Sequence, residues 1–291
     1  MGPSFDLNVC PENSKIGEFV DNVAHSNGRY GLRIFHNLIP REFPCKPFTY
    51  SGNPADPYPT NKPIIANFRN LVAWKNGRNG AIAERVGAVQ FHDFKVADNI
   101  LAGMEFSLSE DIIDGYAKIV GGVAFGKTDN GGSEMDNANT RGVITTRTEN
   151  FGVEGVKFVN FNFNKAAALG DCSHCFHPAA TDSGARHYTV KGLKFDDATV
   201  PRRIRHQLPW RGIWRDEDGS LTGTGQPGWA VAYHKHLEQP ECVFDAATRD
   251  KFEGVICNND VQVRRIIFYN YSPKHFDNLP INILPYEYTT V

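Results

Sequence analysis

One recurring phrase organises the apolar and polar positions along the chain: a Phe, any residue, and then Asp or Asn. Its copies begin at Phe19, Phe68, Phe91, Phe158, Phe195 and Phe268. The first three copies share two further landmarks, an Asn eight residues after the Phe and a Gly twelve residues after it, namely Asn27 and Gly31, Asn76 and Gly80, Asn99 and Gly103. Alternating apolar residues follow each Gly, which is typical of a strand with one buried face. The pattern predicts units of two short strands joined by an Asn/Gly corner.

The spacing of these units predicts a stack. Phe68 and Phe91 stand 23 residues apart, and so short a unit cannot bury its apolar face unless copies pile up as a solenoid. The sequence therefore predicts an all-β fold, a parallel β-helix that spans residues 1–291 as a single domain. Phe19, Phe68 and Phe91 would form one inward ladder of rings. The alternative is a β-sandwich or jelly roll whose strands share the phrase without a common register.

The corner Asn residues would form a second ladder in such a stack. Asn tolerates left-handed backbone, and its amide can bond to the counterpart in the next coil. Loop insertions are expected at about 36–63, 127–142, 201–229 and 239–261, and long loops on a rigid scaffold are where binding or chemistry would sit. The segments 111–116 and 165–169 are the two places where the pattern favours a short helix.

Composition narrows the class of protein. Hydrophobic residues make up 41% and charged residues 22% of the chain, as in ordinary globular proteins. The formal net charge of -2 gives no electrostatic footprint for nucleic acid. No apolar run is long enough for a bilayer-spanning helix, and the start carries no signal-peptide pattern. We therefore expect a soluble chain or a piece of a larger protein.

Six cysteines indicate disulfides in an oxidising compartment. Of the fifteen full pairings, proximity favours Cys10 with Cys45, Cys172 with Cys175, and Cys242 with Cys257. The neighbouring His174 and His177 make zinc the alternative at Cys172 and Cys175, and a redox-active pair is the third option. The one glycosylation sequon begins at Asn270, which also occupies the Asx position of the repeat.

Several long phrases, at 22–26, 29–35, 74–76, 80–84, 97–99, 168–178 (ALGDCSHCFHP), 181–186 and 216–223, resemble the fibrocystin-L-like family. The resemblance extends from about Phe19 to Ile283. It implies a right-handed parallel β-helix that belongs to a large, extracellular, membrane-anchored surface protein, of which this chain is an excerpt. The same segment is similar to that of cell-surface hyaluronidases of the transmembrane protein 2 type.

We expect a non-enzymatic structural or adhesive module of a surface coat, on the extracellular face of the cell and by analogy on cilia. Its partners would be surface or matrix proteins and glycans, not nucleic acid, with membrane contact only through other parts of the parent. The sequence does not decide between this role and an enzyme, because a shared fold does not fix function. The alternative is an enzyme that cleaves a glycosaminoglycan.

Hydrolysis needs two carboxylates, and lyase chemistry needs a base with a group that neutralises the sugar acid. The catalytic candidates are then Asp171, His174, His177, Asp182, Arg186, Asp216 and Asp218. The basic and aromatic stretch offers ligand contacts through Arg202, Arg203, Arg205, Trp210 and Trp214. No cofactor or metal is expected, except that Asp216 and Asp218 could hold calcium.

Overall fold

The computed structural model describes residues 9–53, 55–109, 116–148, 151–171, 187–206 and 212–263. Strands account for nearly all regular structure in these ranges. The helical elements there are short: α1 (Ala246–Phe252) and the 3-10 turns η1 (Pro11–Asn13), η2 (Ser133–Asn137) and η3 (Lys235–Leu237). The all-β class that the sequence predicts is confirmed.

The strands form three sheets. Sheet A contains β3 (Ala66–Arg69), β6 (Val89–His92), β9 (Ala117–Val120), β12 (Phe151–Glu154), β15 (His187–Lys191), β18 (Ile213–Asp216), β19 (Gly228–Ala232), β21 (Gly254–Asn258) and β20 (Cys242–Val243). Sheet B contains β1 (Val23–His25), β4 (Val72–Trp74), β7 (Lys95–Ala97), β10 (Val123–Phe125), β13 (Lys157–Val159) and β16 (Lys194–Phe195). Sheet C contains β2 (Tyr30–Leu38), β5 (Asn79–Val86), β8 (Ala102–Phe106), β11 (Arg141–Thr145), β14 (Ala167–Asp171) and β17 (Ile204–Arg205).

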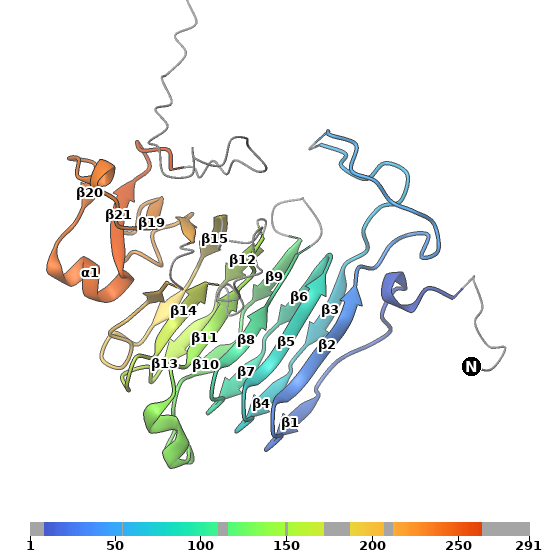
Figure 1. The fold of residues 1–291 in the computed structure, drawn as a ribbon, viewed down its shortest axis with the longest axis horizontal. Helices are drawn as coiled ribbons and strands as arrows, with labels where there is room; N and C mark the ends of the chain where they lie inside the picture. The colour runs from blue at the N-terminus through green and yellow to red at the C-terminus, as the bar shows by residue number, and fades with distance from the viewer. Residues whose placement is uncertain are drawn as a thin grey trace, which may run out of the picture.

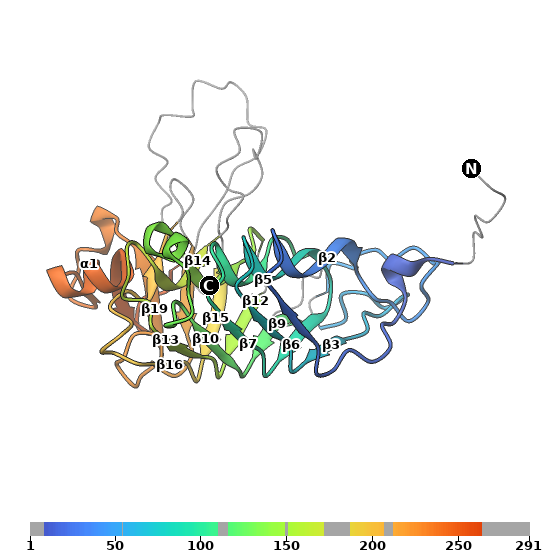
Figure 2. The ribbon, with the colours of Figure 1, turned by 90° about the horizontal axis from the view of Figure 1, so that it is seen from below.

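The chain visits the three sheets in rotation, so that strands three apart in sequence pair with each other. All pairs up to β18 are parallel, whereas β19, β21 and β20 add antiparallel strands at the C-terminal end of sheet A. Figures 1 and 2 show the strands side by side along the long axis, from blue at the N-terminal end to orange. Each coil therefore contributes three strands, not the two that the sequence predicts. The strands of sheet B have only two or three residues, which is too short for an alternation of apolar and polar residues to be recognised in the sequence.

The ring ladder is confirmed at the first coils. Phe68 pairs with Phe91 in register, and their rings stack with centroids 4.9 Å apart. The ring of Phe19 lies 4.9 Å from that of Phe68. However, Phe158 and Phe195 belong to sheet B, where they stack on each other at 5.4 Å. The Phe-x-Asx phrase thus marks two different corners, not one.

The Asx residue of the phrase supplies left-handed backbone at the corner between sheets A and B. Asp21, Asn70 and Asp93 have φ values of 57°, 52° and 53°. In the later coils glycines take over this corner: Gly121, Gly155 and Gly192, with φ of 69°, 65° and 61°. Asn, Asp and Gly are the residues that adopt this conformation at least cost, which explains why the phrase recurs.

The amide ladder is also present. The backbone N and Nδ2 of Asn27 donate to Oδ1 of Asn76 at 3.2 and 3.0 Å, and those of Asn76 donate to Oδ1 of Asn99 at 3.2 and 2.9 Å. The left-handed residue is the one before each Asn, namely Ser26, Lys75 and Asp98. The expectation that the Asn itself adopts this backbone is wrong, because its task is to satisfy backbone and amide groups inside the corner.

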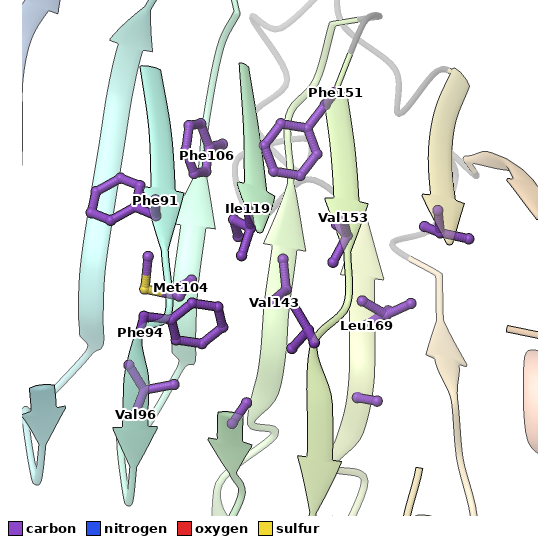
Figure 3. Packing of buried hydrophobic residues seen from close by; sticks show 14 of the residues in the cluster. Phe91, Phe94, Val96, Met104, Phe106, Ile119, Val143, Phe151, Val153 and Leu169 are labelled. Carbon is purple, nitrogen blue, oxygen red and sulfur yellow. The ribbon is translucent and has the colours of Figure 1, made fainter. Parts of the chain in front are cut away.

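The glycine that follows each Asn permits close approach of the coils. A Cβ on Gly80 would lie 2.6 Å from the carbonyl oxygen of Gly103 and 2.9 Å from Nδ2 of Asn99. Any side chain here would therefore push the amide ladder apart. Between the sheets, the core is continuous, and Figure 3 shows Phe91, Phe106 and Phe151 beside the aliphatic residues Ile119 and Val153.

The expected insertions differ in content. The segment 36–63 leaves sheet C after Leu38, and its described residues form no further strand before Ala66, apart from a bridge between Arg41 and Pro63. The segment 127–142 contains η2 and the start of β11. The segments 201–229 and 239–261 carry regular elements: β17, β18 and the start of β19 in the first, and β20, α1 and β21 in the second. These strands are short and begin close to Pro or Gly, so the sequence shows too little alternation of apolar and polar residues for them to be recognised.

Two of the expected disulfides are confirmed, Cys10 with Cys45 and Cys242 with Cys257. The first ties the N-terminal segment to the long loop after β2. Within that loop, the guanidinium of Arg41 is 1% exposed and lies over the rings of Phe48 and Tyr58, at 3.8 and 4.3 Å from their centroids. The loop is thus anchored from within by a buried cation between aromatic rings.

The helix predicted at 165–169 is wrong, because Ala167 to Asp171 form β14. Leu169 pairs with Val143 on one side and Ile204 on the other, so parallel pairing on both edges overrides the helical preference of alanine. In the segment 111–116, residues 111–115 lie outside the described residues.

We predict that Asn76→Ala destabilises the protein by about 1–3 kcal/mol, because it removes the central member of the amide ladder and leaves buried polar groups of the adjacent coils unpaired. Urea unfolding followed by circular dichroism measures this loss. The matched control is Asn27→Ala at the exposed end of the ladder, where the loss should be smaller. Equal losses in the two variants would contradict the ladder as a stabilising feature.

Candidate functional site

An acid–base pair lies at the C-terminal end of sheet C. Asp171 ends β14, and His206 directly follows β17, whose residues Ile204 and Arg205 pair with Leu169 and Gly170. Nδ1 of His206 lies 2.7 Å from Oδ2 of Asp171, and the backbone N of Gly212 donates to the same oxygen at 2.6 Å. Both side chains are buried, with 0% of Asp171 and 2% of His206 exposed.

This contact favours one tautomer of a neutral imidazole. When Nδ1 donates to the carboxylate oxygen, the lone pair of the neutral ring is on Nε2. Nε2 of His206 is buried and has no hydrogen-bond partner among the described residues. The same arrangement, a carboxylate that orients a histidine with one free nitrogen, serves acid–base catalysis in hydrolytic enzymes.

Arg141 lies within electrostatic range of Asp171 and Arg205. Arg141, from β11, donates to the carbonyl oxygens of Asn139, Thr140 and Lys165 at 2.6, 3.1 and 3.1 Å. Burial, reinforced by repulsion from Arg205, lowers the pKa of Arg141 to about 10. The guanidinium thus stays charged at neutral pH.

Glu253 connects this cluster to the C-terminal cap. It follows α1 with a left-handed φ of 50°, accepts from the backbone N of His206 at 3.0 Å and pairs with Arg205 at 3.5 Å. The cluster therefore combines a potential base with cations that could neutralise an acidic ligand. The sequence pointed to Asp171 and Arg205 but missed His206, Arg141 and Glu253. Leu-Gly-Asp at 169–171 and Ile-Arg-His at 204–206 occupy equivalent positions on neighbouring strands. Aligning these two phrases in the sequence could have placed Asp171 beside His206.

The other residues that the sequence predicts to contact a ligand instead contact other parts of the protein. The guanidinium of Arg203 is 7% exposed, donates to the carbonyl of Leu221 at 2.6 Å and lies over the ring of Phe195 at 4.4 Å. Arg202 donates to the carbonyl of Asn164 at 3.1 Å. Trp214 is 0% exposed and packs against Tyr188 in the core, so its ring is not open to a ligand, contrary to the expectation from the sequence.

Asp216 and Asp218 belong to a different place. Asp216 is the last residue of β18, whereas Gly212, which touches Asp171, precedes that strand. At about 3.3 Å per residue, the two regions are on the order of 10 Å apart along the strand. Asp216 is fully buried and accepts from N and Oγ1 of Thr222 at 2.7 and 2.8 Å. Burial raises the pKa of its carboxyl group, and the Thr222 bonds only partly offset this.

Asp218 is exposed and fastens the turn after β18 to the preceding coil. Its carboxylate accepts from the backbone N of Gly192 at 2.7 Å and of Ser220 at 3.0 Å. Its slight burial raises the pKa, but these hydrogen bonds outweigh that effect and lower the pKa overall. Asp216 and Asp218 therefore close the turn, which is a structural use of both carboxylates.

The remaining candidates, His174, His177, Asp182, Arg186 and Trp210, together with Cys172 and Cys175, lie outside the described residues. The choice between disulfide and zinc stays a prediction. In the part of the chain that the structure describes, no three His, Cys, Asp or Glu side chains are grouped so that they could hold a metal ion. No helix within the same ranges has the length and apolarity to cross a membrane.

These features define a class: an all-β protein of parallel strands in stacked sheets, with a buried acid–base cluster at one end. The chain is similar to fibrocystin-L. It is 27% identical to the human protein over 301 residues, which cover 98% of this chain and 7% of that protein. It is 29% identical to the mouse protein over 280 residues, which cover 94% and 6%. The resemblance seen in the sequence is confirmed.

A second relative is the mouse cell migration-inducing and hyaluronan-binding protein, 26% identical over 298 residues, which cover 85% of this chain and 21% of that protein. No family model matches the chain. The chain thus spans less than a tenth of the fibrocystin-L proteins and about a fifth of the hyaluronan-binding relative.

We predict that His206→Ala costs about 3 kcal/mol of unfolding free energy, because the buried carboxylate of Asp171 loses its imidazole partner. Urea unfolding measures the loss. The control is Arg202→Ala on the same strand region, which should change stability by no more than about 0.5 kcal/mol. A His206 variant as stable as the Arg202 variant would contradict the pairing.

We expect opposite pH responses from Asp216→Asn and Asp218→Asn. The raised pKa of Asp216 means that its contribution to stability is present at low pH and is lost as the pH rises from about 4 through the raised value. The lowered pKa of Asp218 makes its contribution present above the ordinary value of about 3.9 and lost as the pH falls through the lowered one. Relative to wild type, the Asp216 variant should therefore gain stability with rising pH and the Asp218 variant should lose it. Urea midpoints measured across the acidic range check the sign, and slopes of equal sign would refute it.

Proposed function

We propose that the chain is a non-enzymatic structural and adhesive module of an extracellular, membrane-anchored surface-coat protein, built as a right-handed parallel β-helix. The observation that carries this proposal is the rotation of the chain through three sheets, with rings and amides stacked in register from coil to coil. Stacked coils bury one another's apolar faces and form a stiff rod with extended outer faces. Such a rod is suited to hold partners at fixed positions.

The disulfides support an extracellular place. Cys10 with Cys45 and Cys242 with Cys257 lie near opposite ends of the stack, and such bonds persist in oxidising compartments. The relationship to fibrocystin-L supports a cell-surface parent, with cilia as the site by analogy. The relative whose name describes it as hyaluronan-binding supports a glycan among the partners.

Polysaccharide cleavage is the second candidate function, and one observation favours it: His206 is oriented by Asp171, its Nε2 has no hydrogen-bond partner among the described residues, and Arg141 lies within electrostatic range of Asp171. A base and a cation that neutralises a sugar acid are the requirements of a lyase. Against this candidate, Nε2 is buried, whereas a base must reach the proton that it abstracts.

We expect that hyaluronan and chondroitin keep their length when they are incubated with the purified chain and calcium, because the imidazole nitrogen is closed to solvent. Gel electrophoresis of the polymers measures their size. Shortening by the wild type that is abolished in His206→Gln and kept in Asp216→Asn would overturn the non-enzymatic proposal in favour of cleavage. The Asp216 variant serves as the control because that carboxyl group lies at the far end of β18 from Gly212, which contacts Asp171.

A further inference from the structure

The sequence contains four Asn-Gly dipeptides, which begin at Asn27, Asn76, Asn79 and Asn130. This dipeptide is prone to deamidation, because the backbone nitrogen of the following residue attacks Cγ of the Asn side chain and Gly hinders that approach least. The reaction needs an Asn side chain that is free to move and a Gly nitrogen that is not already donating a hydrogen bond. These two requirements distinguish the four sites in the structure.

The stack of coils engages this nitrogen in the second and third coils. The backbone N of Gly77 donates to the carbonyl oxygen of Asn27 at 2.8 Å. In the same way, the backbone N of Ile100, which follows Asn99, donates to the carbonyl oxygen of Asn76 at 3.2 Å. Each coil thus supplies an acceptor for the residue that follows the ladder Asn of the next coil. Attack by such a nitrogen requires that its hydrogen bond first breaks.

The first coil lacks this acceptor. Its strands β1 and β2 are the outermost strands of sheets B and C, at the blue end in Figure 1. Gly28 is exposed, and no described residue accepts a hydrogen bond from its backbone N. Asn27 is exposed as well, and its Nδ2 donates to Oδ1 of Asn76, but no described residue donates to its own Oδ1. The first member of the amide ladder is therefore held on one side only.

The two remaining dipeptides are each protected by one of the requirements. Asn79 is 0% exposed within β5, and its Nδ2 donates to Glu105 at 2.5 Å. Asn130 is exposed, but the backbone N of Gly131 donates to the carbonyl oxygen of Thr128 at 2.9 Å. Of the four sites, only the first combines an exposed Asn with a Gly nitrogen for which no described residue is an acceptor.

We infer that Asn27 is a site of spontaneous deamidation. The nitrogen of Gly28 forms a bond to Cγ of Asn27, and the bond from Cγ to Nδ2 breaks. Ammonia leaves with the proton of the Gly28 nitrogen, and a cyclic succinimide remains. Water, the only further reactant, then opens the ring. Opening at Cγ gives aspartate, whereas opening at the main-chain carbonyl carbon gives isoaspartate, whose backbone runs through Cβ and Cγ. This modification does not depend on the proposed adhesive function.

The modification opens the amide ladder at its first step. A carboxylate has no hydrogen to donate, so the bond from residue 27 to Oδ1 of Asn76 is lost and a negative charge faces an acceptor oxygen. Isoaspartate also adds a methylene group to the backbone of a tightly packed corner, where a Cβ on Gly77 would collide with the carbonyl group of Gly28. We therefore expect the first coil to separate from the second at this corner.

The test incubates the folded chain at body temperature and mildly alkaline pH. Peptide mapping by mass spectrometry measures the deamidated fraction at each of the four sites over time. Asn27 should react at least about tenfold faster than Asn76, the same dipeptide one coil further in, because Asn76 reacts only after local opening of the ladder. It should also react faster than Asn130. In urea, where the coils are unfolded, the rates at Asn27 and Asn76 should converge.

Gly28→Ala tests the attacking nitrogen. A Cβ on Gly28 meets no atom within 4 Å, and the backbone there is not left-handed, so the fold accepts alanine while the methyl group hinders the attack. Deamidation of Asn27 should slow at least about fivefold. The matched control is Gly17→Ala, where a Cβ also meets no atom within 4 Å and the preceding residue is Ile16. It should keep the wild-type rate. Circular dichroism confirms that both variants are folded.

The loosening of the first coil is measured on the deamidated chain, which carries one more negative charge and separates by anion exchange. The backbone N groups of Gly77 and Arg78 donate to the carbonyl oxygens of Asn27 and Arg29 at 2.8 and 2.7 Å. Their amide hydrogens should exchange with solvent faster than in the unmodified chain. Exchange in β15, several coils away, should not change.

Three results would overturn the inference: reaction at Asn76 or Asn130 as fast as at Asn27 in the folded chain, an intact Asn27 under conditions in which the unfolded chain reacts, or a folded Gly28→Ala variant that deamidates at the wild-type rate. The comparison of folded and unfolded wild type needs no variant, so the test holds even if Gly28→Ala does not fold. Unchanged exchange at Gly77 and Arg78 in the deamidated chain would refute the opening of the corner.

Discussion

The structure depends on one constraint: every coil must bury its apolar face and satisfy its inward polar groups against the next coil. A single coil of three short strands has no core of its own. In isolation its rings would be exposed to water and its amide groups would lack partners from a neighbouring coil. Asn76 shows both sides of the constraint, since it donates to Asn99 and accepts from Asn27 while only 1% exposed. A polar residue is tolerated inside the corner because its neighbours repeat it.

The corners follow from that constraint. Neighbouring coils stay in register only if each turns at the same residue, and the backbone there is left-handed. Asn or Asp serves in the first coils and Gly in the later ones, as at Asp93 and Gly121, because these residues pay least for that conformation. Gly80 is needed for a different reason, because a Cβ at this position would clash with the carbonyl oxygen of Gly103. What recurs in the sequence is thus the geometry of the corners more than the composition of the strands.

This explains how far the sequence could predict the fold. The stacking of Phe68 on Phe91 and the amide ladder could be read from spacing alone, since the corners impose a fixed period. The third strand of each coil could not, because a segment such as Val72–Trp74 is too short to show alternation. The sequence predicted only some residues of the acid–base cluster. Asp171 and His206 are distant in the sequence, and only the register of β14 with β17 brings them together.

The three sheets also divide the chemistry of the surface. On sheet A the outward charges neutralise each other around Glu154. On sheet C the outward side chains of the central strands, Ile82, Glu105 and Ile144, are themselves buried. Only on sheet B do exposed rings and unpaired lysines coincide within the described coils. Because the strands of that sheet are so short, its corners lie close on both sides, and the face forms a narrow strip along the axis.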